Sequence, residues 1–164
     1  MDRTLSYVRE FIWLAFAALA AAAFLFPVVR SIRYHFLVEN ALLIILSLTY
    51  LRYAITFRDL PWVRPRPVRW IWGFVNILLL IALFFRLQRF TELFESFSLY
   101  VFTDVPHDLS IGAEGELLGY IQAQILAFAA LFIVSTLALE FRILRSLFRR
   151  GRERTEIIYR NEST

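Results

Sequence analysis

The sequence lacks cysteine and lysine entirely, and it holds only two histidines and one methionine among 164 residues. Without cysteine, disulfides, thiolate catalysis and zinc or iron–sulfur sites with cysteine ligands are excluded. His35 and His107 both lie outside the apolar segments, so haem ligation by a histidine pair inside a bundle is not expected. Glycine-rich phosphate loops, catalytic carboxylate pairs and serine–histidine–aspartate arrangements are also missing. The sequence therefore predicts no enzyme, no cofactor and no metal site.

Apolar and aromatic residues are abundant: they make up 59% of the chain, and the mean hydropathy is +0.59. A water-soluble domain of this length could not bury so much apolar surface. The apolar residues are also grouped in runs close to the length that crosses about 30 Å of hydrocarbon. The chain is therefore expected to be an integral membrane protein.

Four segments are long and apolar enough to cross a bilayer, and they cover residues 11–29, 36–55, 68–87 and 117–141. The first follows Arg3 and Arg9 and is rich in alanine, which is also typical of a cleaved signal peptide. We favour a retained helix, because apolar residues continue through Val29. The expected fold class is all-α: a polytopic four-transmembrane-helix bundle over residues 1–141, with residues 142–164 as a basic cytoplasmic extension of the last helix.

The third connection is the longest, and its first half is unusually apolar. Residues 90–102 hold too many aromatic and aliphatic side chains for a solvated loop. We expect this segment to lie at the membrane interface as a helix, with Phe94 and Phe97 facing lipid.

The arginines are distributed unevenly between the two sides of the membrane. Four spans place both termini and the proline-rich second connection on one side, which holds 14 of the 18 arginines. The other side keeps Arg30, Arg33, Arg86 and Arg89. Because basic residues accumulate on the cytoplasmic side, we expect a plasma or inner membrane protein with both termini in the cytoplasm.

Basic residues recur regularly just after the last span. Arg142, Arg145, Arg149 and Arg152 follow one another at spacings of three, four and three, so they share one face of a helix. Such a face is expected to bind anionic lipid headgroups, or else a cytoplasmic partner. A voltage sensor is disfavoured, because no arginine lies within residues 122–139.

The apolar spans contain a few polar side chains. An ionisable group among membrane helices is a candidate functional residue, because burying it without a partner is costly. Glu39 and Arg86 fall at similar depth, so we expect an ion pair, with a proton or cation site at Glu39 as the alternative. Asn76 lies nearer the middle of its span and is expected to form an interhelical hydrogen bond.

Small residues repeat at four-residue spacing on two spans. Gly119, Ala123 and Ala127 do so on the fourth span, and Ala17 with Ala21 does so on the first. Such stripes let helix backbones approach closely, either inside the bundle or against another subunit.

These features favour a non-catalytic integral membrane subunit, or an accessory or assembly factor, of a larger membrane protein complex. Its expected partners are anionic lipid headgroups and other membrane subunits or further copies of itself, with no nucleic acid. The alternative function is a small oligomeric ion channel or transporter that uses Glu39 and Asn76.

Overall fold

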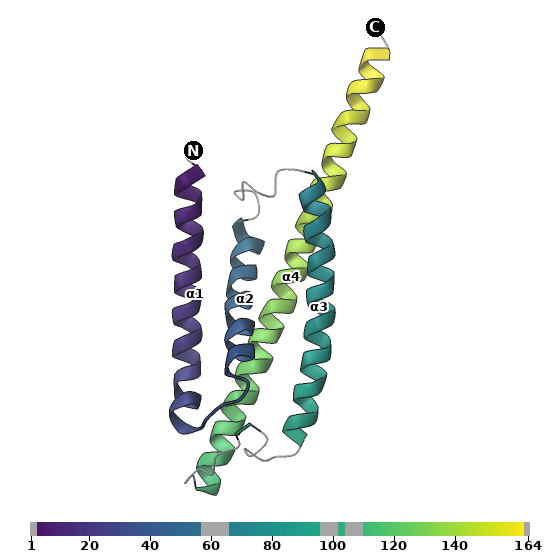
Figure 1. Ribbon diagram of the computed structural model, residues 1–164. Coiled ribbons are helices and arrows are strands. Elements are labelled where there is room, and N and C mark those ends of the chain that lie inside the picture. Colours follow the sequence, from purple (N-terminus) through teal and green to yellow (C-terminus); the bar gives the residue numbers. More distant parts are fainter. Residues whose placement is uncertain (1–2, 57–65, 96–101, 104–109, 163–164) are drawn as a thin grey trace.

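The computed structural model describes residues 3–56, 66–95, 102–103 and 110–162 (Figure 1). Within them the chain forms helices and no strand: α1 (Arg3–Ser31), α2 (Leu37–Thr56), α3 (Arg66–Glu95) and α4 (Ile111–Glu162). Each of the four contains a segment long and apolar enough to span a membrane. The predicted all-α bundle with four transmembrane helices is therefore confirmed.

The helices alternate in direction along the chain, so α2 and α4 run parallel to each other (Figure 1). α2 packs extensively against both α1 and α4, whereas α3 packs mainly on α4. Buried small and aliphatic residues on α1 follow spacings of four, four and three: Ala17, Ala21, Leu25 and Val28. The Ser47 hydroxyl donates a hydrogen bond of 2.8 Å to the Phe128 carbonyl, which links α2 to the backbone of α4.

Residues 90–95 are helical as predicted, but the prediction that Phe94 faces lipid was wrong. α3 continues without interruption to Glu95, and Phe94 is only 9% exposed, so it does not face lipid. Its ring packs against the ring of Phe102 at 5.2 Å between centroids. The aromatic character of this segment reflects packing inside the protein, while Phe97 lies outside the described residues.

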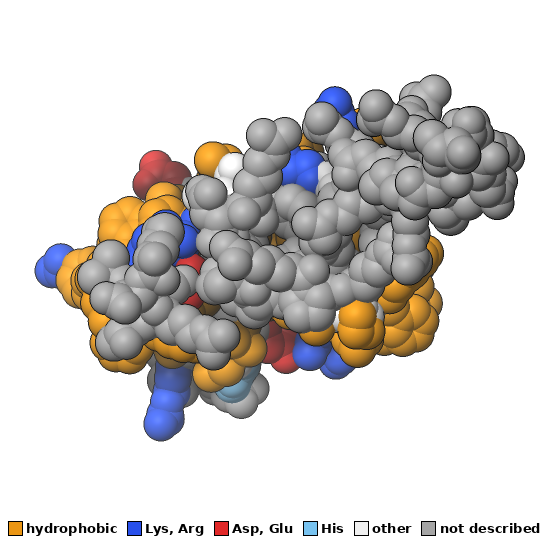
Figure 2. All heavy atoms as spheres, turned by 90° about the horizontal axis from the view of Figure 1, so that it is seen from above, with side chains coloured by type: hydrophobic (Ala, Val, Ile, Leu, Met, Phe, Trp, Pro, Cys, Tyr) orange, Lys and Arg blue, Asp and Glu red, His pale blue; other side chains and the backbone are white. Residues whose placement is uncertain are grey.

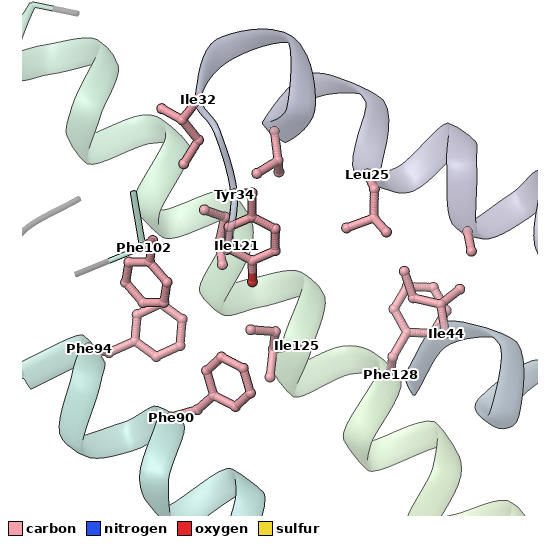
Figure 3. Packing of buried hydrophobic residues seen from close by; sticks show 12 residues of the cluster. Leu25, Ile32, Tyr34, Ile44, Phe90, Phe94, Phe102, Ile121, Ile125 and Phe128 are labelled. Carbon is pink, nitrogen blue, oxygen red and sulfur yellow. The ribbon is translucent and has the colours of Figure 1, made fainter. Parts of the chain in front are cut away.

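Aromatic side chains close the end of the bundle at the α1–α2 connection (Figure 3). The backbone amide of His35 donates to the Phe102 carbonyl at 3.0 Å, which holds the residue beside the connection. The rings of Tyr34 and Phe102 stack, and both side chains are buried. Burial raises the pKa of the Tyr34 phenol, because the charged form is poorly solvated there. This aromatic cluster fixes how α3 meets the rest of the bundle.

The fourth helix is much longer than a membrane is thick. α4 contains 52 residues, which corresponds to about 78 Å at the standard helical rise. Its C-terminal part projects past the ends of the other three helices (Figure 1). Viewed from the end that carries the termini, hydrophobic side chains are visible around the edge of the described part of the bundle (Figure 2).

Candidate functional site

A buried polar triad joins three helices. Asn76 of α3 is fully buried, and its amide nitrogen donates to Glu140 Oε2 of α4 at 3.1 Å. The Tyr50 hydroxyl of α2 donates to Asn76 Oδ1 at 3.0 Å. Asn76 thus forms the interhelical hydrogen bonds expected of it, and its partners are Tyr50 and Glu140.

Glycine makes room for the carboxylate of this triad. A Cβ atom added at Gly73 would lie 2.9 Å from Glu140 Oε1, which is closer than side chains pack. Gly73 lies almost one turn before Asn76 on α3. The missing side chain lets the Glu140 carboxylate lie against α3, where Asn76 holds its other oxygen.

A second cluster joins α1 to α2. Arg52 donates to both carboxylate oxygens of Glu10, at 2.7 and 3.1 Å. The Tyr53 hydroxyl donates to the same carboxylate at 3.3 Å, and the Arg52 guanidinium lies 5.4 Å from the centre of the Trp13 ring. Arg52 is 8% exposed and Glu10 is 24% exposed. Both charges are therefore compensated within the protein.

A third polar contact lies near the opposite end of α2. Arg86 Nη1 of α3 donates to Glu39 Oε2 of α2 at 2.6 Å, so the two side chains form an ion pair. The side chains of Arg86 and Glu39 are 51% and 37% exposed. The pair bridges the mouth of a mainly apolar groove between α2 and α3, which has α4 as its floor.

The stripe of Gly119, Ala123 and Ala127 does not pack inside the bundle. All three residues are exposed, and a Cβ atom at Gly119 would meet nothing within 4 Å. Among the described residues, no other helix therefore packs closely against the stripe as a whole. On α1 the structure buries Ala17 and Ala21.

The four arginines after the last predicted span all belong to α4. Arg142 donates to the Ile55 carbonyl at 3.0 Å. It thereby caps the last turn of α2, where a positive charge also complements the helix dipole. Arg145 is exposed, and the structure does not describe the side chains of Arg149 and Arg152. Arg142 thus has a structural role that its regular spacing did not indicate.

Several polar residues of the site were missed by the sequence reasoning. Glu10 was not singled out, and Arg52 was counted only toward orientation. Their opposite charges at similar depth in neighbouring apolar helices are a signal that could have found this pair. The side chains of Asn40 and Gln124 are buried and make no hydrogen bond with other described residues.

The described residues contain no group of three or more histidine, aspartate or glutamate side chains placed to hold a metal ion. The three polar contacts join helices, and two of them pair opposite charges. Their arrangement is suited to holding a membrane bundle together. No protein family, curated protein or solved structure matches this chain.

Proposed function

We propose that the chain is a non-catalytic integral membrane subunit, or an assembly factor, of a larger membrane complex. The observation that carries this proposal is the length of α4. Its candidate membrane-spanning segment lies within Gly112–Arg145, and residues 146–162 continue as helix past the ends of the other helices (Figure 1). That continuation adds about 25 Å of helix.

An isolated helix of this length is marginally stable in water, so a projecting helix gains stability by packing on something else. The backbone of residues 146–162 extends past the ends of α1, α2 and α3 (Figure 1). A helical rod that leaves the membrane and is rich in arginine suits contact with another subunit beside the membrane. This is why we favour a subunit of a complex over a protein that works alone.

The alternative function, a channel or transporter that uses Glu39 and Asn76, has less support. Glu39 is paired with Arg86, whereas Asn76 is paired with Tyr50 and Glu140. Arg86 follows Asn76 by ten residues on α3, which separates the two clusters by about 15 Å. A mainly apolar groove, lined by leucines, begins at the Glu39 pair. No described polar path connects the two residues.

We further propose that both termini lie in the cytoplasm, because most arginines lie on their side of the membrane. A reporter fused after Thr164 is expected to show cytoplasmic activity, and a reporter inserted beside Ser110 is expected to show exterior activity. Paired phosphatase and fluorescent-protein fusions measure both positions. The reverse assignment of the two sites would contradict this orientation.

Removing the projecting helix tests the proposed function. A chain that stops after Arg145 keeps all three polar contacts and the Arg142 cap on α2. It is expected to insert normally and to keep its melting temperature within about 2 °C, since no described contact of the bundle is lost. Native gel electrophoresis of mildly solubilised source membranes should show the full chain in a complex well above 19.3 kDa and the shortened chain outside it.

A full-length control distinguishes a partner from lipid binding. Replacing every arginine in 146–164 with lysine keeps the charge that attracts anionic headgroups but loses the planar contacts that arginine makes with proteins. We expect this variant to lose the complex while it keeps binding to anionic vesicles. A full-length chain that migrates alone from source membranes would contradict the proposed function.

A further inference from the structure

The groove between α2 and α3 has a volume of about 210 Å³ and a strongly apolar lining. Leu42 and Leu46 line it from α2, Leu79 and Leu83 from α3, and Ile125 and Phe132 of α4 form its floor. A groove that lies along membrane helices and is lined by such side chains matches a hydrocarbon chain. Apart from Asn40, which is adjacent to Glu39 on α2, the lining between the Glu39–Arg86 pair and the far end of the groove offers no polar side chain to a water-soluble ligand.

Two opposite charges, Arg86 and Glu39, lie at the mouth of the groove, and each keeps hydrogen-bonding atoms that their ion pair does not use. Arg86 uses one of its guanidinium N–H donors on Glu39 Oε2, and a guanidinium has five. Glu39 uses one of its two carboxylate oxygens in that contact. Both side chains are more than one third exposed, so the remaining donors and the second oxygen are accessible from outside.

The length of α2 indicates how deep the Glu39–Arg86 pair lies in the membrane. α2 contains 20 residues, which gives a length of about 30 Å, equal to the hydrocarbon thickness. Glu39 lies in the first turn of α2. The pair therefore lies at the boundary between hydrocarbon and headgroups, and the apolar groove runs from it toward the membrane centre.

We propose that this groove binds one phospholipid whose headgroup carries a phosphate and a primary amine, as in phosphatidylethanolamine. The phosphate binds the free donors of Arg86, the ammonium group donates to Glu39, and one acyl chain occupies the groove. In the lipid the acyl chain follows the charged headgroup, and in the protein the apolar groove follows the charged pair Glu39–Arg86. This inference is independent of the proposed function.

Charge complementarity favours this lipid over other occupants. An anionic lipid without an amine would place its phosphate beside the Glu39 carboxylate with nothing to compensate that charge. A choline headgroup has no N–H to donate to Glu39. A helix of a partner protein could fill the apolar part, but it would cover two charges that need polar contacts at the interface.

Native mass spectrometry of the purified full-length protein tests the proposal. The probes are phosphatidylethanolamine, phosphatidylcholine and phosphatidylglycerol with identical acyl chains. The lipid concentration at which the wild-type protein retains phosphatidylethanolamine should be about ten-fold lower than the concentration needed for phosphatidylcholine or phosphatidylglycerol. This difference corresponds to one additional charge-assisted hydrogen bond. Glu39→Gln should abolish the preference over phosphatidylcholine, and Arg86→Gln should weaken the binding of all three lipids.

A groove-filling variant separates the groove from the charged pair. Ala82 lines the groove, so Ala82→Phe occupies it while Glu39 and Arg86 remain. This variant should lose the tightly bound lipid. Ala22→Phe on the exposed side of α1 and Arg89→Gln outside the groove should bind as the wild type does. Thermal unfolding of each variant confirms that it is folded, and the exposed pair itself contributes little to stability.

Two results would overturn the proposal. One is equal retention of the three lipids by the wild-type protein, and the other is undiminished binding by the folded Ala82→Phe variant. Because the chain has no other cysteine, Ala82→Cys also provides a unique attachment point for a photocrosslinker. In source membranes this position should crosslink to lipid. Crosslinking to another protein instead would assign the groove to a partner helix and reject the lipid site.

Discussion

Replacing Arg52 with methionine is expected to lower the free energy of unfolding by about 3 kcal/mol, as is typical when one member of a buried ion pair is removed. The guanidinium holds both oxygens of Glu10 and is 8% exposed. Its loss leaves the Glu10 carboxylate partly buried, with Tyr53 as the remaining described donor. The midpoint of unfolding in a mixed-detergent titration measures the effect.

Two further variants make this expectation specific. Adding Glu10→Gln to Arg52→Met should recover part of the loss, because the uncompensated charge is removed. Arg86→Met is the matched control, since it breaks an ion pair of similar length whose side chains are 51% and 37% exposed. Such exposed pairs contribute less than about 1 kcal/mol. Equal destabilisation by Arg52→Met and Arg86→Met would show that burial does not decide the strength of these contacts.

Asn76→Leu is expected to cost about 2 kcal/mol, which is the usual penalty for leaving buried polar groups without partners. The substitution removes the donor to Glu140 and the acceptor of the Tyr50 hydroxyl at once. Asn76 is 0% exposed, so water cannot replace either hydrogen bond in the folded bundle. The same unfolding titration, read by tryptophan fluorescence from Trp72 beside Tyr50, measures the loss.

Substitutions of Glu140 distinguish the contribution of its hydrogen bond with Asn76 from the contribution of its negative charge. Glu140→Gln keeps an oxygen that accepts from Asn76 and should change stability by less than about 1 kcal/mol. Combining Asn76→Leu with Glu140→Leu should be less damaging than the sum of the single losses, because both partners become apolar. A large effect of Glu140→Gln with little effect of Asn76→Leu would contradict this account, since the charge itself would then be essential.

The helix count and the position of each apolar segment followed from the sequence. An apolar run of about 20 residues has few stable alternatives to a membrane-spanning helix, because backbone groups in lipid must bond within their own segment. The common depth of Glu39 and Arg86 followed from the same reasoning. Depth depends only on the position of a residue along its own helix, and the sequence alone determines that position.

The rotation of each helix about its axis was decided only by the tertiary structure. In lipid, leucine and phenylalanine are equally stable facing outward or inward, so hydropathy does not show which face packs inside. Phe94 was therefore expected at the lipid surface, although Phe102 folds against it. The exposed stripe around Ala123 illustrates the same ambiguity. The pairing of Asn76 with Glu140 required α3 and α4 to be brought together, because side chains distant in sequence meet only where their helices pack.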